Sequence, residues 1–187
     1  MKMPYPRAVS ALGYGFMKKQ LILFRHGKSD WNTETSADHD RPVAKRGIKA
    51  AKVMGHLLTL AHRAPDSVVT SSAVRARTTV ELAAEAGNWT CPIRVTDDLY
   101  EATPAKVLQV MHQEPDATHT LLFAGHEPTW SEMTARLIGG GNIEFPTAAM
   151  ACIGFEIPCW TSANFGSGTL QWFLRPKFFT EGDFDFA

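Results

Sequence analysis

The chain of 187 residues carries 19 basic and 19 acidic residues, so its formal net charge is zero, and 44% of its residues are hydrophobic. This composition is typical of a globular protein with a sizeable core; it excludes a largely disordered chain and a nucleic-acid-binding protein with an extensive basic surface. Three scattered cysteines without a CxxC pair predict neither a disulfide framework nor a zinc site and favour a reducing, cytoplasmic compartment, and no apolar run approaches the ~20 residues that span a bilayer.

Strand and helix signals alternate along the chain. The predicted strands are residues 21–24, 67–70, 93–96, 120–124, 149–156 and 169–174. The predicted helices are residues 44–63, 73–86, a helix beginning at Thr103-Pro104, and 131–137. We expect Ser71-Ser72 to cap the second helix, Gly87 to close it, and the last two strands to form a hairpin at the sheet edge. The alternation predicts an α/β three-layer sandwich, with a mostly parallel central sheet flanked by helices.

The first 17 residues precede the predicted strands and helices. Residues 1–17 contain two prolines and two glycines and lack a continuous apolar stretch, so they make a poor signal peptide, and Met17 looks like a natural start. We expect residues 1–17 to be an extension of unknown role and residues 18–187 to form a single domain.

The first predicted strand is followed directly by two polar residues and a glycine: Arg25, His26 and Gly27. In an open α/β sheet, ligands bind at the carboxyl ends of the strands, so we expect Arg25 and His26 to face a crevice and Gly27 to let a bound group approach the backbone. The strand at 120–124 ends similarly in Gly125-His126, and Arg75 falls in the first turn of the second predicted helix. The arginine fork and a helix N-terminus both suit phosphate oxygens. Two arginines and two histidines that converge would form a pocket for a tetrahedral dianion.

These residues resemble the histidine phosphatase superfamily. Its Arg-His-Gly hallmark after the first strand is matched by residues 25–27, and the Trp-Asn of many members by Trp31-Asn32. Its Ser-Ser/Pro-x-x-x-Arg-Ala pattern is matched by residues 71–76, and its late Gly-His by Gly125-His126. The resemblance runs from about residue 20 to residue 173, and the order of the four elements makes it far more specific than an isolated Arg-His-Gly.

The resemblance implies a metal-independent and cofactor-independent phosphatase. His26 would attack phosphorus and form a covalent phosphohistidine that water hydrolyses. Arg25, Arg75 and His126 would bind the phosphoryl oxygens and stabilise their charge. Because a third positive charge is disfavoured beside Arg25 and Arg75, these arginines would also lower the pKa of His26.

The general acid and the outer part of the pocket follow from finer matches. Leu99-Tyr100-Glu101 corresponds to the family's Leu-x-Glu, which makes Glu101 the expected proton donor, with Asp38 and Asp40 as fallback acids; the alternative for each is a solvated loop acid. Residues 40–43 and Gly47 resemble the Asp-Arg-Pro-Leu-x-x-x-Gly stretch of the small SixA-type members. We therefore add residues to the expected phosphate pocket, with surface or capping roles as the alternative: Gly27, Ser29, Asn32 and Arg41.

The SixA-type resemblance predicts that the substrate is phosphohistidine on a partner protein. A small-molecule phosphomonoesterase is the alternative, because a retained Glu101 would be useful for phosphate esters. A mutase and a catalytically silent phosphoanion-binding module are further alternatives. We expect neither a nucleic acid nor a membrane as partner, and the oligomeric state stays open. The remaining histidines, including His39, fit no metal motif and are left as structural or exposed.

Overall fold

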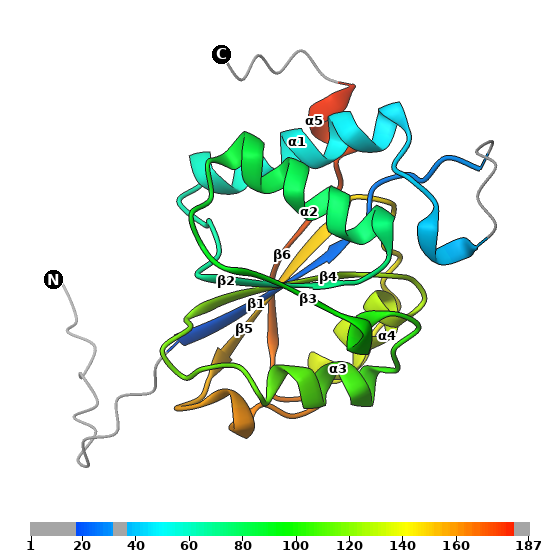
Figure 1. Cartoon of the computed structure of the whole chain (residues 1–187). Helices are drawn as coiled ribbons and strands as arrows, with labels where there is room; N and C mark the ends of the chain where they lie inside the picture. Colours follow the sequence, from blue (N-terminus) through cyan, green and yellow to red (C-terminus); the bar gives the residue numbers. More distant parts are fainter. Residues whose placement is uncertain (1–17, 32–36, 182–187) are drawn as a thin grey trace, which may run out of the picture.

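The computed structural model describes residues 18–31 and 37–181. This part of the chain contains one six-stranded sheet (Figure 1). The strand order is β3-β2-β4-β1-β5-β6, in which β3, β2, β4 and β1 are parallel to one another and β5 and β6 are antiparallel additions at one edge. The strands are β1 (Lys18–Arg25), β2 (Ser67–Ser71), β3 (Ile93–Thr96), β4 (Thr120–Gly125), β5 (Met150–Glu156) and β6 (Thr169–Leu174). The predicted extension, residues 1–17, lies outside the described residues.

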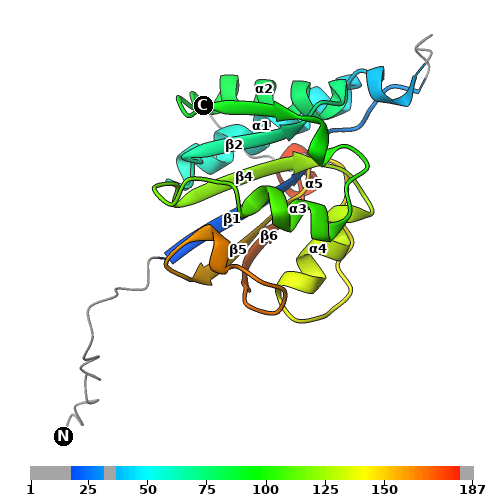
Figure 2. The same cartoon turned by 60° about the horizontal axis from the view of Figure 1, so that its bottom comes forward.

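Helices cover both faces of this sheet (Figures 1 and 2). On one face lie α1 (Lys45–Leu60), α2 (Val74–Gly87) and the short α5 (Lys177–Thr180), and on the other lie α3 (Pro104–Met111) and α4 (Thr129–Leu137). Three short 3-10 helices complete the described structure: η1 (Asp38–Asp40), η2 (Asp97–Leu99) and η3 (Trp160–Ser162). Within residues 18–31 and 37–181, no helix combines the length and the apolar character that a membrane span requires. The predicted α/β sandwich is confirmed.

The central strand β1 explains why its sequence is continuously apolar. Leu21 and Leu23 pack into the core beneath α3 and α4, whereas Ile22 and Phe24 pack into the core beneath α1 and α2. All four side chains are fully buried. A strand that is covered on both faces needs apolar residues at every position, so the run stops only where the chain leaves the sheet.

The boundaries of α2 differ from the prediction. Ala73, not Ser72, is its N-cap residue and makes no side-chain cap bond, although the Ser71 hydroxyl accepts a hydrogen bond from the Ala73 amide at 3.3 Å. At the other end, Asn88 adopts the left-handed conformation (φ 51°) that was expected near Gly87. Gly87 is needed for packing instead, because an added Cβ would meet Trp89 Nε1 at 2.3 Å. The prediction for α3 is confirmed: Thr103 caps it, and Pro104 occupies its first turn.

Candidate active site

The two histidines meet because their strands are neighbours. β1 and β4 pair in parallel with Arg25 opposite Gly125, so the residues that follow them leave the sheet together. The His26 amide donates to Gly125 O at 3.0 Å, and the His26 and His126 ring centroids are 5.1 Å apart. β2 lies on the other side of β4 and leads into α2, whose first turn carries Arg75.

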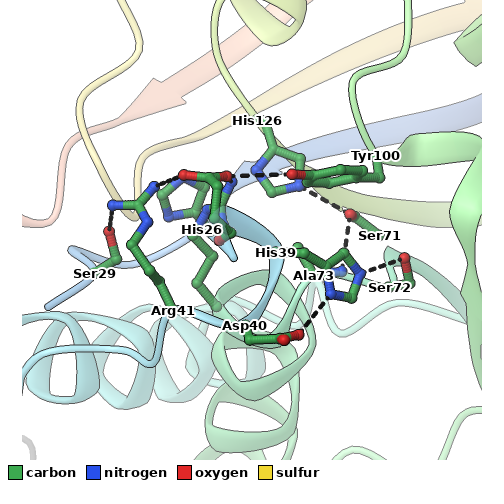
Figure 3. A network of polar contacts seen from close by, with 12 residues as sticks. His26, Ser29, His39, Asp40, Arg41, Ser71, Ser72, Ala73, Tyr100 and His126 are labelled. Atoms are coloured by element: carbon green, nitrogen blue, oxygen red, sulfur yellow. Dashed lines mark hydrogen bonds and ion pairs between the residues drawn. The ribbon is translucent and has the colours of Figure 1, made fainter. Parts of the chain in front are cut away.

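A pocket of about 650 Å³ opens at this carboxyl edge of the sheet. Most of the residues predicted for the site line it: Arg25, His26, Ser29, Arg41, Arg75, Glu101 and His126. Asn32 lies outside the described residues. Figure 3 shows His26, His126, Arg41, Ser29 and Tyr100, all of which line this pocket, within one network of polar contacts.

One ring nitrogen of His26 is engaged in a hydrogen bond. Its Nδ1 lies 2.7 Å from Gly27 O. A carbonyl oxygen can only accept, so Nδ1 carries the proton and Nε2 keeps a free lone pair. Burial, and then the positive charges of Arg75, Arg25 and Arg41, lower the pKa of His26 to about 4, against the opposing effect of the Gly27 hydrogen bond. At neutral pH, His26 is therefore an uncharged imidazole with Nε2 available as a nucleophile.

His126 is also neutral. Burial first, and then His26 and Arg75, lower its pKa to about 3. Its Nε2 pairs with the Ser71 hydroxyl at 2.8 Å, and the Tyr100 ring contacts it edge-on with centroids 5.6 Å apart (Figure 3). If Ser71 donates, the His126 proton lies on Nδ1, which has no hydrogen-bond partner among the described residues. His126 can thus offer a neutral N–H donor rather than a charge.

The arginines reach the pocket from three different elements. Arg75 is 95% buried and directs its guanidinium at Asp38, with Nη1 to the Asp38 carbonyl at 2.6 Å and Nη2 to the carboxylate at 2.8 Å. Arg41 donates to the Ser29 hydroxyl at 3.0 Å and to the other Asp38 carboxylate oxygen at 2.5 Å, and it stacks on Trp31 at 3.7 Å from the ring centroid. Arg25, at the end of β1, donates to Phe145 O.

Asp38 thus places a carboxylate against two pocket arginines. Although partial burial acts in the opposite direction, Arg75 and Arg41 lower the pKa of Asp38, so it is ionised at neutral pH. The Tyr100 hydroxyl donates to the same carboxylate at 3.3 Å. The group bound by these donors in the structure is therefore itself an anion.

Among the described residues, four buried side-chain nitrogens have no hydrogen-bond partner, and every one belongs to a residue of this pocket: Nε of Arg25, Arg41 and Arg75, and Nδ1 of His126. Buried polar groups are normally satisfied, so such a cluster needs an explanation. A site built to surround an anion with N–H groups provides one, because the donors then outnumber the acceptors of the protein itself.

Sequence and structure comparisons identify the family. The family model described as histidine phosphatase superfamily (branch 1) matches residues 21–137. An uncharacterized protein of Mycobacterium tuberculosis is 37% identical over 163 residues, which cover 82% of this chain and 99% of that protein. The chain belongs to the histidine phosphatase superfamily. This membership makes it a phosphatase, as the sequence predicted.

Solved structures of the superfamily share the fold at low identity. A protein histidine phosphatase SixA complexed with tungstate aligns with a TM-score of 0.71 and 22% identity, covering 86% of this chain and 99% of that one. A phosphoserine phosphatase from Entamoeba histolytica, in complex with phosphoserine, aligns with a TM-score of 0.62 and 13% identity over 85% of this chain and 98% of the other. The fold alone therefore accommodates both protein and small-molecule phosphatases.

The candidate general acids of this histidine phosphatase differ in whether they line the pocket and in what they contact. Glu101 lines the pocket, is exposed, and has no hydrogen-bond or ion-pair partner among the described residues. It adopts a left-handed backbone conformation (φ 49°), which is uncommon for glutamate. Asp38 also lines the pocket but is bound by arginines, whereas Asp40 does not line it and pairs with His39. Glu127 and Glu132, which belong to none of the matched motifs, line the same pocket.

The structure gives Gly27 a packing role besides the predicted one. Its amide donates to the Thr79 hydroxyl at 2.8 Å, so this N–H is already used. An added Cβ would meet Gly47 O at 3.0 Å, which means that the glycine permits close packing of the nucleophile loop against α1. This packing requires a glycine whether or not a ligand is bound, and the expectation that Gly27 lets a bound group approach the backbone stays a prediction.

Several residues of the site were missed. Thr79 follows Arg75 by one helical turn, donates to Arg75 O at 2.6 Å, and supports the Gly27 amide, so it links the nucleophile loop to the helix of the second arginine. His39, left as structural or exposed, bridges Asp40 and Ser72 at 3.0 Å each and fixes η1 beside the pocket (Figure 3). The i, i+4 spacing of Arg75 and Thr79 and the adjacency of His39 and Asp40 were the only local signals. The contacts of Thr79 with Gly27 and of His39 with Ser72 join segments far apart in the sequence.

Proposed function

We propose that this phosphatase removes phosphate from phosphohistidine in proteins through a covalent intermediate on His26. The observation that carries the proposal is the hydrogen bond from His26 Nδ1 to Gly27 O, because it leaves Nε2 unprotonated within an arginine-lined pocket. The resemblance to a SixA structure supports the substrate class. A cytoplasmic location remains a prediction.

The reaction proceeds in two displacements. His26 Nε2 attacks phosphorus, the bond from phosphorus to the substrate nitrogen breaks, and the departing imidazole keeps that electron pair and takes up a proton. Water then attacks the phosphorus of the phosphoenzyme, gives up a proton, and releases inorganic phosphate with His26 restored. Splitting the transfer in this way replaces one difficult step by two easier ones.

The surrounding donors stabilise the transferring group. Arg25, Arg75 and Arg41 supply positive charge, and a neutral His126 supplies an N–H. In this role they balance the charge spread over the equatorial oxygens of the phosphoryl group. Phosphate must displace the Asp38 carboxylate from Arg41 and Arg75, or share these donors with it.

The surroundings of the pocket support a protein-borne substrate. Trp31 lies at its rim with 68% of its surface exposed, stacked on Arg41, as an accessible platform beside the nucleophile. Exposed aromatic and arginine side chains are enriched where proteins bind one another. An imidazole leaving group also demands less help from a general acid than an alkoxide does.

A small-molecule phosphomonoesterase is the second candidate, favoured by Glu101. This carboxyl lines the pocket without a partner in residues 18–31 and 37–181, and it could protonate an alkoxide. The phosphoserine phosphatase with the same fold supports this alternative.

The two candidates are separated by assaying wild type and Glu101→Gln against a phosphohistidine-bearing protein and a panel of phosphate monoesters. We expect efficient turnover of the phosphohistidine protein by both, and loss of any ester hydrolysis in Glu101→Gln. Selective hydrolysis of one small ester, with no action on phosphohistidine, would overturn the proposal in favour of a metabolic phosphatase.

A further inference from the structure

A second hollow of about 650 Å³ adjoins the phosphate pocket. It lies between the start of α1 and the segment around α5, which are neighbours in Figure 1, and the loop that carries Pro146 closes one side. Lys28 and Thr147 line both hollows. A chain segment that places a phosphoryl group on His26 can therefore continue into this groove, which we call the α1–α5 groove.

The charge of the α1–α5 groove is positive. One acidic side chain, Glu181, lines the groove. Four basic side chains line it as well: Lys28, Arg46, Arg175 and Lys177. Within the described part of the chain, Lys28 and Arg46 have no ion-pair partner, and Arg175 approaches Glu144 only at 3.9 Å. Lys177 pairs with Glu181 at 3.3 Å, but both side chains are more than 60% exposed. Most of this positive charge is therefore uncompensated, although the whole chain is neutral.

The floor and rim of the α1–α5 groove are apolar. Gly47, Ala50 and Pro176 are buried beneath it, and Phe178 stands at its edge with 70% of its surface exposed. Phe178 and Trp31 are the two most exposed large hydrophobic side chains among the described residues, and each lines one of the two adjoining hollows. Aromatic side chains are enriched at the surfaces and hot spots where proteins bind one another.

We propose that the α1–α5 groove binds an acidic segment of the phosphoprotein substrate next to its phosphohistidine, with an apolar side chain of that segment packed on Phe178. This inference rests on the proposed function and names the partner feature that the site recognises. Charge complementarity selects an acidic partner, since Arg46 and Lys177 lie at opposite sides of the groove on different elements. The direct continuation into the phosphate pocket couples this recognition to catalysis.

The test uses three substrates with the full chain: free phosphohistidine, a phosphohistidine peptide with Asp and Glu flanks, and a peptide with Lys flanks. The variant is Arg46→Glu with Lys177→Glu, and the control is Lys52→Glu with Arg77→Glu, two exposed lysine and arginine positions outside the groove. We expect wild type and control to prefer the acidic peptide, and the groove variant to lose about tenfold in kcat/KM on that peptide while keeping its activity on free phosphohistidine. Phe178→Ala should lower kcat/KM on the acidic peptide several-fold in the same selective way.

The proposal is overturned if wild type does not prefer the acidic peptide, or if the groove variant and the control behave alike. Loss on all three substrates would also overturn it, because the groove would then only support the fold. The competing occupant is the chain's own segment 182–187, which contains two aspartates. We expect a chain that ends at Glu181 to match wild type. A higher kcat/KM of this shortened chain on the acidic peptide would assign the groove to segment 182–187. Fluorescence anisotropy with the unphosphorylated acidic peptide measures groove binding even if no phosphohistidine is hydrolysed, so failure of the proposed function is told apart from failure of this inference.

Discussion

Asp38→Ala should tighten the binding of inorganic phosphate. In the structure, the Asp38 carboxylate accepts from Arg75 at 2.8 Å and from Arg41 at 2.5 Å, the same guanidiniums that a phosphate would use. A bound phosphate must therefore replace these contacts or tolerate a negative charge beside it. The substitution removes the competing anion and keeps the bond from Arg75 to the Asp38 carbonyl, which holds η1 in place.

The expected size follows from the exposure of this carboxylate. Its side chain is 52% exposed, so each ion pair is worth about 0.2–1 kcal/mol, towards the upper end for short charge-assisted bonds. Two such pairs amount to about 1–2 kcal/mol, which corresponds to a Kd for phosphate lower by roughly 5- to 30-fold.

Isothermal titration calorimetry with orthophosphate, and inhibition by orthovanadate, measure this effect. Asp40→Ala is the matched control, because it removes an equal charge from the same 3-10 helix, at a residue that pairs with His39 and does not line the pocket. Weaker or unchanged phosphate binding in Asp38→Ala would refute the reasoning and show that the carboxylate orients the arginines instead of competing for them.

Three further substitutions test the supports of the nucleophile. Arg75→Gln should raise the pKa of His26 from about 4, because it removes one of the positive charges that lower this pKa. Arg77→Gln, on the same helix, should leave it unchanged. NMR titration of the histidine rings measures both variants, and an equal pKa of His26 in the two would contradict the account. Thr79→Val should leave the buried Gly27 amide unpaired and destabilise the fold by about 1–3 kcal/mol, with a fall in kcat. Gly47→Ala should lower the Tm, because its Cβ would lie 2.5 Å from Lys28 O; a Tm equal to that of wild type in either variant would show that the loop relaxes freely.

The layered fold was predictable because its signals are local. The apolar runs that became β1 and β4 are short, end abruptly and alternate with amphipathic segments, and both strands are buried on both faces as such runs require. The cap of α2 was not predictable in the same way. Ser71 and Ser72 are both good capping residues, but one pairs with His126 and the other with His39, so tertiary contacts outweighed the local preference.

The site was predictable to the extent that the chain carries it in contiguous motifs. Arg25, His26, Arg75 and His126 were found because each lies at or next to the end of a regular element, and the structure brings all of them to one pocket. The contact of Asp38 with Arg75 spans 37 residues and leaves no trace in the sequence. The same holds for the Gly27 amide, whose partner on α2 is 52 residues away.

Trapping the phosphoenzyme tests the central claim most directly. Wild type is mixed with a phosphohistidine substrate, quenched in alkaline denaturant, which preserves phosphohistidine, and mapped by mass spectrometry after proteolysis. The account predicts one added phosphoryl group on His26 that is lost in acid, and neither this adduct nor turnover in His26→Ala, with the fold of that variant verified by circular dichroism. Turnover retained in His26→Ala, or a phosphoryl group on another residue of the pocket, would contradict it.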